Sequence, residues 1–481
     1  MLTFSELTSV FSSIDFGSIL GWTASAAILP VIGSTMMPDT SEQDEPEFDE
    51  QGLRSQIAEM EKLRTRTIEQ QEELAELYVK IAIGLYTFDE DCELQEIFDF
   101  FAKAEAVLRQ TLAQGEDDET RRKLGTVDLH RAVTYNDCDG MDEAVQCYTS
   151  AIETLTPLEN KGDGEAKYDI AGMKLNRGMI FHELGEFEKA NKDYDEAFLA
   201  FRAVEKISDL DTRFYMAKVS VAQGSLFRDM DEPLEKIVDA YNRAMRLYVE
   251  LIDVGQLEHE RELANVLMDR CTAMYEAYMN KEFESESERT EKFDAVLLDI
   301  DRAIEILQKN AVDGNSIARI DLFNAHTSRG AMLLDLEKFD DALSIFDQVI
   351  KDFAEFESET DPVLVNQFGA AYENRGFALM NRNRFEEALA SFNRAITCRE
   401  RIQSPSFELD DDERENFVPG LATLYANRAN AYAALKKMDE AKADCRLGIQ
   451  LLQPLKSKDG EELDEIDEIE TMLKALLEIL G

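Results

Sequence analysis

The chain has 481 residues, of which 100 are acidic and 51 basic, so its formal net charge at pH 7 is -49. A protein that binds phosphate backbones needs clustered Lys and Arg, and the longest basic run here is the three residues 121–123. The composition therefore disfavours nucleic acids and anionic lipid head groups as partners. An acidic surface attracts basic partners, but it also keeps a protein soluble, and composition alone favours the second explanation.

The first 38 residues differ from the rest of the chain. Residues 16–38 contain no charge, and 13 of these 23 residues are apolar. This length is enough to cross a bilayer, yet no Lys or Arg precedes Arg54, whereas a secretory signal starts with a basic region. Three interpretations stay open: a tail that contacts the repeat array, a docking segment for a partner, and a membrane anchor. Residues 39–50, with seven Asp or Glu in twelve, are expected to be a disordered acidic linker.

A helical pattern begins after the linker. It predicts an N-terminal helix over residues 51–73 and a repeat array over residues 74–456. The clearest repeat unit is 370–396, which has the pattern of two helices joined by a turn at 381–384. Composition agrees with an all-α fold, because helix-forming residues are plentiful and Pro occurs only 9 times.

The second helix of each unit starts at a lead position. In the units led by residues 141, 187, 339 and 385 this position is followed by Ala at offset 3, an aromatic residue at offset 7, and Ala or Val at offset 10, and the other units are weaker copies. The lead positions are residues 94, 141, 187, 234, 293, 339, 385 and 438, and five of the seven intervals are 46 or 47 residues. Two longer intervals contain polar insertions, at 281–292 and 404–416. We expect both insertions to be loops, because a loop tolerates extra residues at small entropic cost.

The first helix of each unit carries a small residue. These residues are Ala132, Gly178, Ser225, Cys271, Gly330, Gly376 and Ala429, nine residues before the lead position except where the insertion at 281–292 intervenes. A small residue in the first helix and the aromatic and Ala pattern in the second resemble the tetratricopeptide repeat family. That resemblance implies a right-handed α-solenoid of about eight stacked helix-turn-helix repeats. The family's usual period is about 34 residues, and HEAT and armadillo repeats, with periods of about 40–47, are the structural alternative. The paired small residues favour the tetratricopeptide repeat.

Residues 457–481 are predicted to form a C-terminal capping helix, because the last repeat of an array exposes an apolar face unless something covers it. A dimerisation helix is the alternative. The six cysteines have no CxxC spacing and imply no disulfide framework. Three of them, Cys147, Cys271 and Cys445, fall in or beside core positions of the repeats. A reducing compartment such as the cytoplasm follows from this, with membrane association through the N-terminal segment as the alternative.

The sequence does not predict an enzyme. It has only four histidines, and none is followed by another His or by a Cys three or four residues later. The motifs HExxH, GxSxG, GxxxxGK[ST] and GxGxxG do not occur. Carboxylates are too numerous for any pair of them to be diagnostic. We therefore predict no catalytic residue, no metal and no cofactor.

The family resemblance implies a groove for a peptide. In tetratricopeptide repeat proteins, the position two residues before the small residue lines the concave face. Here that position holds Asn176, Asn374 and Asn427, and in other units His130, Asp269 and Ser328. An Asn amide is both a donor and an acceptor, so it can pair with the backbone of an extended peptide; the alternative is a hydrogen bond to the adjoining helix. The predicted groove residues are His130, Asn176, Ser328, Asn374, Asn427 and Asn430.

Some family members bind a chaperone's C-terminal carboxylate through a Lys placed one residue earlier. The corresponding residues here are Leu175, Glu373 and Ala426, so the resemblance does not extend to this carboxylate clamp. An acidic partner tail would be repelled. A partner with a basic segment is expected instead.

Arginine recurs at the position just before the small residue. The six residues are Arg131, Arg177, Arg270, Arg329, Arg375 and Arg428. Because a buried unpaired charge is costly, we expect each of them to find an Asp, a Glu or a carbonyl oxygen. Asp193 is the predicted partner of Arg177, and Asp444 that of Arg428.

These patterns predict a non-catalytic scaffold or adaptor that binds a peptide segment or partner protein in the concave groove of a solenoid. One alternative is an acidic chaperone for a basic or aggregation-prone client. The other is a membrane-tethered assembly factor that uses residues 1–37.

Overall fold

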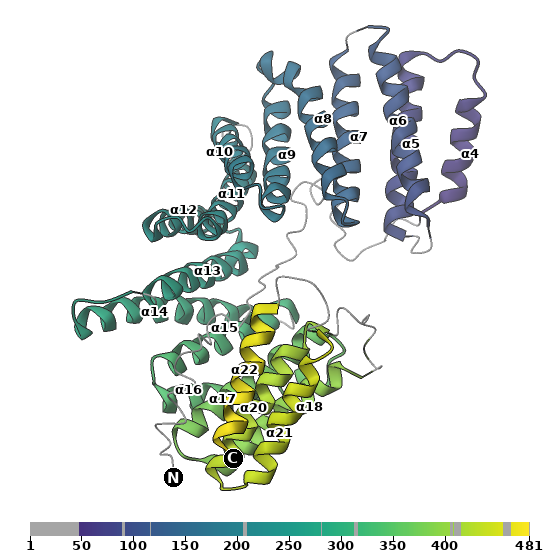
Figure 1. The fold of residues 1–481 in the computed structure, drawn as a ribbon. Coiled ribbons are helices and arrows are strands. Elements are labelled where there is room, and N and C mark those ends of the chain that lie inside the picture. The colour runs from purple at the N-terminus through teal and green to yellow at the C-terminus, as the bar shows by residue number, and fades with distance from the viewer. Residues whose placement is uncertain are drawn as a thin grey trace. The chain divides into compact units, whose positions relative to one another are not determined.

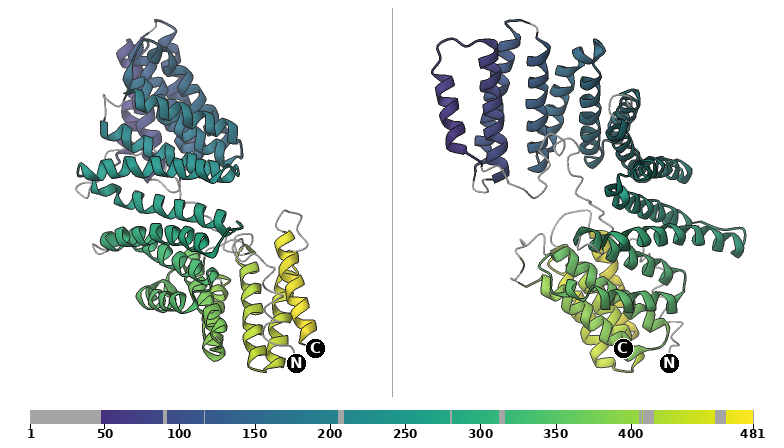
Figure 2. Two further views of the ribbon diagram at one scale, coloured as in Figure 1. Left: turned by 90° about the vertical axis from the view of Figure 1, so that its left-hand side faces the viewer. Right: turned by 180° about the vertical axis from the view of Figure 1, so that it is seen from behind.

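The computed structural model describes residues 48–88, 92–115, 117–204, 209–279, 281–311, 316–404, 407, 415–455 and 463–480. Every regular element in these ranges is a helix, which confirms the all-α prediction, and Figure 1 and Figure 2 show the helices following one another as hairpins. The predicted segment 1–38 and most of the acidic linker lie outside the described residues.

Two compact units divide the described chain, one ending at Glu282 and the other starting at Phe283. The first unit contains α4 (Glu50–Glu61), α5 (Ile68–Phe88), α6 (Leu94–Leu112), α7 (Asp118–Asp137), α8 (Met141–Asn160), α9 (Gly164–Glu183), α10 (Phe187–Val204), α11 (Asp209–Asp229), α12 (Leu234–Asp253), the short 3-10 helix η1 (Leu257–His259) and α13 (Glu260–Met279). The second contains α14 (Glu286–Ala311), α15 (Ser316–Asp335), α16 (Phe339–Asp352), the 3-10 helix η2 (Ala354–Ser358), α17 (Pro362–Asn381), α18 (Phe385–Ile402), α20 (Val418–Ala434), α21 (Met438–Leu452) and α22 (Leu463–Ile479). The helix pairs of the predicted solenoid are thus present, but the predicted fifth pair, α13 with α14, is divided between the units.

The hairpin turns share one backbone conformation. Each contains a residue with positive φ seven positions after the small residue: Asp139, Gly185, Asp231, Glu337, Asn383 and Lys436. The next residue donates its N–H to the carbonyl five residues earlier, at 2.7 to 2.9 Å, as in Gly140 to Tyr135 and Arg384 to Leu379. This is the Schellman arrangement that ends helices. The turn geometry therefore repeats even where the turn sequence does not.

Glycine in the first helix allows an aromatic ring of the second helix to approach closely. A Cβ on Gly376 would lie 2.6 Å from Phe392 Cε1, and one on Gly224 would lie 2.6 Å from Tyr241 Cε1. The predicted small residue in the second case was Ser225, which is wrong by one position. The loop between α11 and α12 is one residue longer than in the other hairpins, so the count from the lead position shifts.

One predicted insertion loop is largely helical. The loop was expected over 281–292, but α14 begins at Glu286 and continues to Ala311. Polar residues do not prevent a helix when one face is solvated, and Glu and Lys are good helix formers. Most of the other insertion, 404–416, lies outside the described residues.

The two ends of the array also differ in part from expectation. Instead of a single helix over 51–73 there are α4 and α5, separated at residues 62–67. The last residues assigned to the linker are ordered: Asp49 caps α4 by accepting from Gly52 N at 2.8 Å, and Phe48 stacks on Phe88 with centroids 5.8 Å apart. At the other end α22 packs on α20 and α21, as a capping helix should.

Candidate functional site on the first helices

The first helix of each hairpin lies on the inner side of its unit. Among the described helices, α9 contacts α11 and α11 contacts α13, and in the second unit α15 contacts α17 and α17 contacts α20. Successive second helices make no contacts of this extent in the same ranges. A stack in which the first helices are closer together curves toward them. The first-helix surface of each unit is therefore the concave side, where a peptide groove was predicted.

Two of the six predicted groove residues are buried instead of lining an open groove. Asn176 and Ser328 are each only 4% exposed. The Asn176 amide donates to Tyr148 Oη at 3.3 Å, and Ser328 Oγ donates to the Asn324 carbonyl at 2.5 Å. These two assignments are corrected: both side chains stabilise the array.

The other four predicted groove residues are half-buried. The His130 ring has its pKa lowered to about 4 by burial, so it is neutral at pH 7. The Asn427 amide donates to Glu373 Oε1 at 2.9 Å, which joins α20 to α17. Asn374 and Asn430 make no side-chain hydrogen bond to any described residue. Their amides keep both donor and acceptor capacity for a ligand.

The recurring arginines are all paired, as predicted. Arg177 binds both oxygens of Asp193 at 2.7 and 2.8 Å, and Arg428 binds Asp444 with the same distances. The remaining partners are Glu105 for Arg131, Asn242 for Arg270, Asp301 for Arg329, and Asp347 for Arg375. The oxygen that accepts from Arg270 is the side-chain carbonyl of Asn242. Several of these arginines reach the second helix of their own pair and that of the preceding pair, so they connect successive hairpins.

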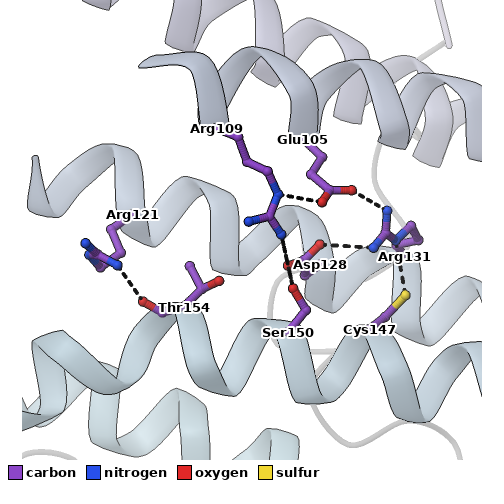
Figure 3. A network of polar contacts seen from close by, with 8 residues as sticks. All are labelled: Glu105, Arg109, Arg121, Asp128, Arg131, Cys147, Ser150 and Thr154. Atoms are coloured by element: carbon purple, nitrogen blue, oxygen red, sulfur yellow. Dashed lines mark hydrogen bonds and ion pairs between the residues drawn. The ribbon is translucent and has the colours of Figure 1, made fainter. Parts of the chain in front are cut away.

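Figure 3 shows the most extended of these connections, between α6, α7 and α8. Glu105 accepts from Arg109 at 2.7 Å and from Arg131 at 2.5 Å. Asp128 is fully buried, accepts from Ser150 Oγ at 2.6 Å, and lies 3.3 Å from Arg131 Nη2. Burial raises the pKa of this carboxyl, against the opposing effect of Ser150 and Arg131. Both carboxylates lie beside arginines of the same network, so these contacts connect α6, α7 and α8.

A second charged cluster lies on the first-helix surface and was not predicted. His182 on α9 pairs with Asp229 on α11 through Nε2 and Oδ2, 2.8 Å apart, and this hydrogen bond lowers the pKa of Asp229. Burial raises the pKa of Asp269 on α13 to about 6, with Arg228 opposing the shift, and burial also raises the pKa of Glu276. Asp229, Asp269 and Glu276 thus all interact electrostatically with Arg228, and Asp229 is also paired with His182. Additional positive charge would stabilise this cluster.

Replacing Asp269 with Asn is expected to stabilise the protein in a pH-dependent way. A carboxyl whose pKa is raised on folding contributes stability below its unfolded pKa, and that stability is lost as the pH rises toward the folded pKa of about 6. The stability of the Asn variant minus that of the parent should therefore grow by about 1–3 kcal/mol between pH 4 and pH 6 and then stay level. Urea unfolding at several pH values measures it. Asp229→Asn is the control, since a lowered pKa predicts the opposite slope; a flat difference for Asp269→Asn would contradict the assignment.

Sequence inspection missed this cluster although a signal existed. In the first unit an acidic residue lies five positions after the crossing residues Ala132, Gly178, Gly224 and Cys271, at Asp137, Glu183, Asp229 and Glu276. The signal was hidden because carboxylates are abundant everywhere in the chain.

Metal binding and membrane insertion find no support in the described ranges. No three His, Cys, Asp or Glu side chains there are placed to hold a metal ion. None of the helices built from those residues has an apolar stretch long enough to cross a membrane. Cys147, Cys271, Cys398 and Cys445 are buried and form no disulfide with any described residue. Burial agrees with the prediction that Cys147, Cys271 and Cys445 lie in or beside core positions.

Comparison with known proteins identifies the repeats. Two family models, both described as tetratricopeptide repeat, match residues 369–402 and 422–451. These ranges cover α17 with α18 and α20 with α21, the hairpins whose pattern is clearest. A search of curated proteins finds no match.

Solved structures with helical repeats are similar to this chain at low identity. BtubC from P. vanneervenii is 20% identical, with a TM-score of 0.39, over 56% of this chain and 94% of that chain. A signal transduction ATPase with a tetratricopeptide repeat sensor from Pyrococcus horikoshii is 12% identical, with a TM-score of 0.46, over 85% of this chain and 50% of that chain. The complex of the TPR2AB domain of yeast Sti1 with pHSP90 is 17% identical, with a TM-score of 0.22, over 73% and 98%.

Proposed function

Because two tetratricopeptide repeat models match residues 369–402 and 422–451, we propose that the chain is a repeat protein of that family and a non-catalytic scaffold or adaptor. It binds an extended segment of a partner protein on its first-helix surface. The proposal rests mainly on Asn374 and Asn430, whose side-chain amides make no hydrogen bond to any described residue. They lie on α17 and α20, two first helices that contact each other.

An apolar contact is available beside these amides. Phe377 follows Asn374 by one helical turn and is 39% exposed, although most Phe side chains in the unit are buried. An amide pair contributes about 1 kcal/mol per hydrogen bond, and an aromatic side chain adds apolar area that amides lack. Together they provide backbone recognition and a side-chain contact for one extended segment.

Charge favours a basic segment in the partner. The chain carries a formal charge of -49, and Glu373 occupies the position at which a carboxylate-binding family member has Lys. Attraction of this kind raises the association rate more than the final affinity and weakens with salt.

The double variant Asn374→Ala/Asn430→Ala tests the site. Affinity purification and mass spectrometry identify the partner, and calorimetry then compares its binding to the parent and to the variant. Loss of two hydrogen bonds of ordinary strength predicts about 2 kcal/mol, or roughly thirtyfold weaker binding. Thermal stability should be unchanged, because neither amide has a partner among the described residues.

The control for this experiment is Asn160→Ala/Asn310→Ala. It removes two amides from α8 and α14, which are second helices of their pairs. Equal affinities of the parent and of Asn374→Ala/Asn430→Ala would move the binding site elsewhere.

Two alternative functions have distinct tests. An acidic chaperone would keep a basic client soluble without forming a defined complex. A membrane-tethered assembly factor would sediment with membranes and lose this property when residues 1–37 are removed.

A further inference from the structure

The turn between α4 and α5 carries basic and apolar side chains together. Residues 62–68 (KLRTRTI) contain three basic residues and no acidic one, in a chain whose formal net charge is -49. The two large apolar side chains of this stretch lie on the surface, with Leu63 40% and Ile68 47% exposed. We call residues 62–68 the basic turn. It offers both kinds of contact that a segment with acidic and apolar residues needs.

The cations of the basic turn are available to a partner. Lys62 and Arg64 are exposed and form no ion pair with any residue that the structure describes. By contrast, Lys123 in the basic run 121–123 pairs with Glu72 at 2.9 Å. Like charges close together repel each other, and a carboxylate-rich segment would relieve this repulsion at the turn.

Local hydrogen bonds fix the shape of the basic turn. Arg66 Nε donates to the Met60 carbonyl at 2.8 Å, which ties the turn to the end of α4. Thr67 and Gln70 cap the start of α5 reciprocally: Gln70 N donates to Thr67 Oγ1 at 3.2 Å, and Thr67 N donates to Gln70 Oε1 at 3.0 Å. A surface that is fixed beforehand loses less conformational entropy on binding than a mobile one.

The chain itself contains a segment of complementary chemistry. Residues 16–38 contain no charge and 13 of these 23 residues are apolar, and residues 39–47 contain five Asp or Glu. The apolar part complements the exposed Leu and Ile of the basic turn, and the acidic part complements its cations. This segment joins α4 at the helix's N-terminal end, through Phe48 and Asp49.

The connection is long enough for the segment to reach the turn. The helix α4 has 12 residues and so is about 18 Å long, at 1.5 Å per residue. Residues 39–47 span up to about 30 Å when they are extended. They can therefore run back along α4 and bring residues 16–38 to the basic turn at the other end of the helix.

We propose that residues 16–47 bind in cis to the basic turn. Their carboxylates pair with Lys62 and Arg64. Their apolar side chains cover Leu63 and Ile68. Terminal elements of a repeat array need such a cover.

Tethering and charge favour this occupant over two competitors. A segment attached by a short linker has an effective concentration of about 1 mM, which a second copy of the chain does not reach in dilute solution. An anionic membrane also attracts basic and apolar side chains. The acidic residues 39–50 and the net charge of -49 oppose that attraction.

Trp22 reports on the contact, because it is the only tryptophan of the chain and lies within residues 16–38. In the full chain its emission should be blue-shifted and protected from quenching by acrylamide, since an apolar surface covers the ring. Raising the salt concentration from about 0.1 M to 1 M shortens the screening length from ~10 to ~3 Å and should reduce the protection.

Two variants of the basic turn test the two kinds of contact separately. Lys62→Glu/Arg64→Glu reverses the charge, and Leu63→Ser/Ile68→Ser removes the apolar surface. Each should abolish the protection of Trp22 and shift its emission to longer wavelength. The changed side chains are exposed, so helix content measured by circular dichroism should equal that of the parent.

Phe88→Ser/Leu94→Ser is the matched control. These side chains are also exposed, at 53% and 47%, but they lie at the end of α5 and the start of α6 and not in the basic turn. The control should keep Trp22 protected. An unprotected Trp22 in the parent, or equal protection in the parent and both turn variants, overturns the inference.

The competing occupants give different results in the same measurement. Protection that grows with protein concentration assigns residues 16–47 to a second copy of the chain. Protection that appears only after vesicles of anionic phospholipid are added assigns them to a membrane. Either result overturns binding in cis.

Discussion

Replacing Arg177 with Met is expected to lower the free energy of unfolding by about 3–5 kcal/mol. The guanidinium holds both oxygens of Asp193 at 2.7 and 2.8 Å and also donates to Thr149 on the preceding hairpin at 2.9 Å. Asp193 is only 3% exposed. Removal of the arginine leaves a buried carboxylate without its counter-charge, and this cost exceeds the value of the ion pair itself.

Two further variants check the cause of that loss. The double variant Arg177→Met/Asp193→Leu should recover most of the stability, because an apolar pair of similar volume replaces a buried ion pair at little cost. Lys161→Met, which breaks an exposed pair with Asp118, should change stability by about 0–1 kcal/mol. Denaturant unfolding measures all three. A single variant as stable as the parent would show that the arginine is not needed to compensate Asp193.

Replacing Phe392 with Ala is expected to cost about 3–5 kcal/mol. The ring is 1% exposed and packs against Gly376, where a Cβ would lie 2.6 Å from Cε1. Deleting the ring opens a cavity at the helix crossing. Gly376 has no side chain that could fill this cavity. Since each repeat is stabilised mainly by its neighbours, α17 and α18 should lose protection from hydrogen exchange more than distant helices.

Phe377→Ala is the matched control for this prediction. Phe377 lies one residue from Gly376 on the same helix but is 39% exposed, so its truncation should cost far less. Limited proteolysis and hydrogen exchange compare the two variants. Similar losses for both would mean that the crossing is not the source of stability.

The periodicity of the sequence was sufficient to predict the fold class and the pairing of the recurring arginines. A period of 46 residues with small and aromatic residues at fixed offsets leaves few arrangements other than stacked helix hairpins. The pairing of Arg177 with Asp193 and of Arg428 with Asp444 was predictable as well, because an unpaired buried charge costs too much to occur. Both arguments depend on chemistry that is local to one repeat.

The repeat period could not predict the exact lengths of the turns or the secondary structure of the insertions. One additional residue in the loop before α12 moved the crossing glycine from position 225 to Gly224, and the start of α14 at Glu286 turned a predicted loop into helix. Loop length and helix extension respond to packing that no periodicity encodes. The same limit applies to α4 and α5, predicted as one helix.

What the sequence by itself determined about this protein is its class, an all-α array of tetratricopeptide-like repeats with paired arginines and a strongly acidic surface. Tertiary structure alone decided which side chains are available to a ligand. Asn176 and Asn374 occupy the same repeat position, yet the first is buried against Tyr148 and the second keeps an unpaired amide. The physical reason is that exposure depends on the residues of the neighbouring repeat, and these vary while the repeat position stays the same.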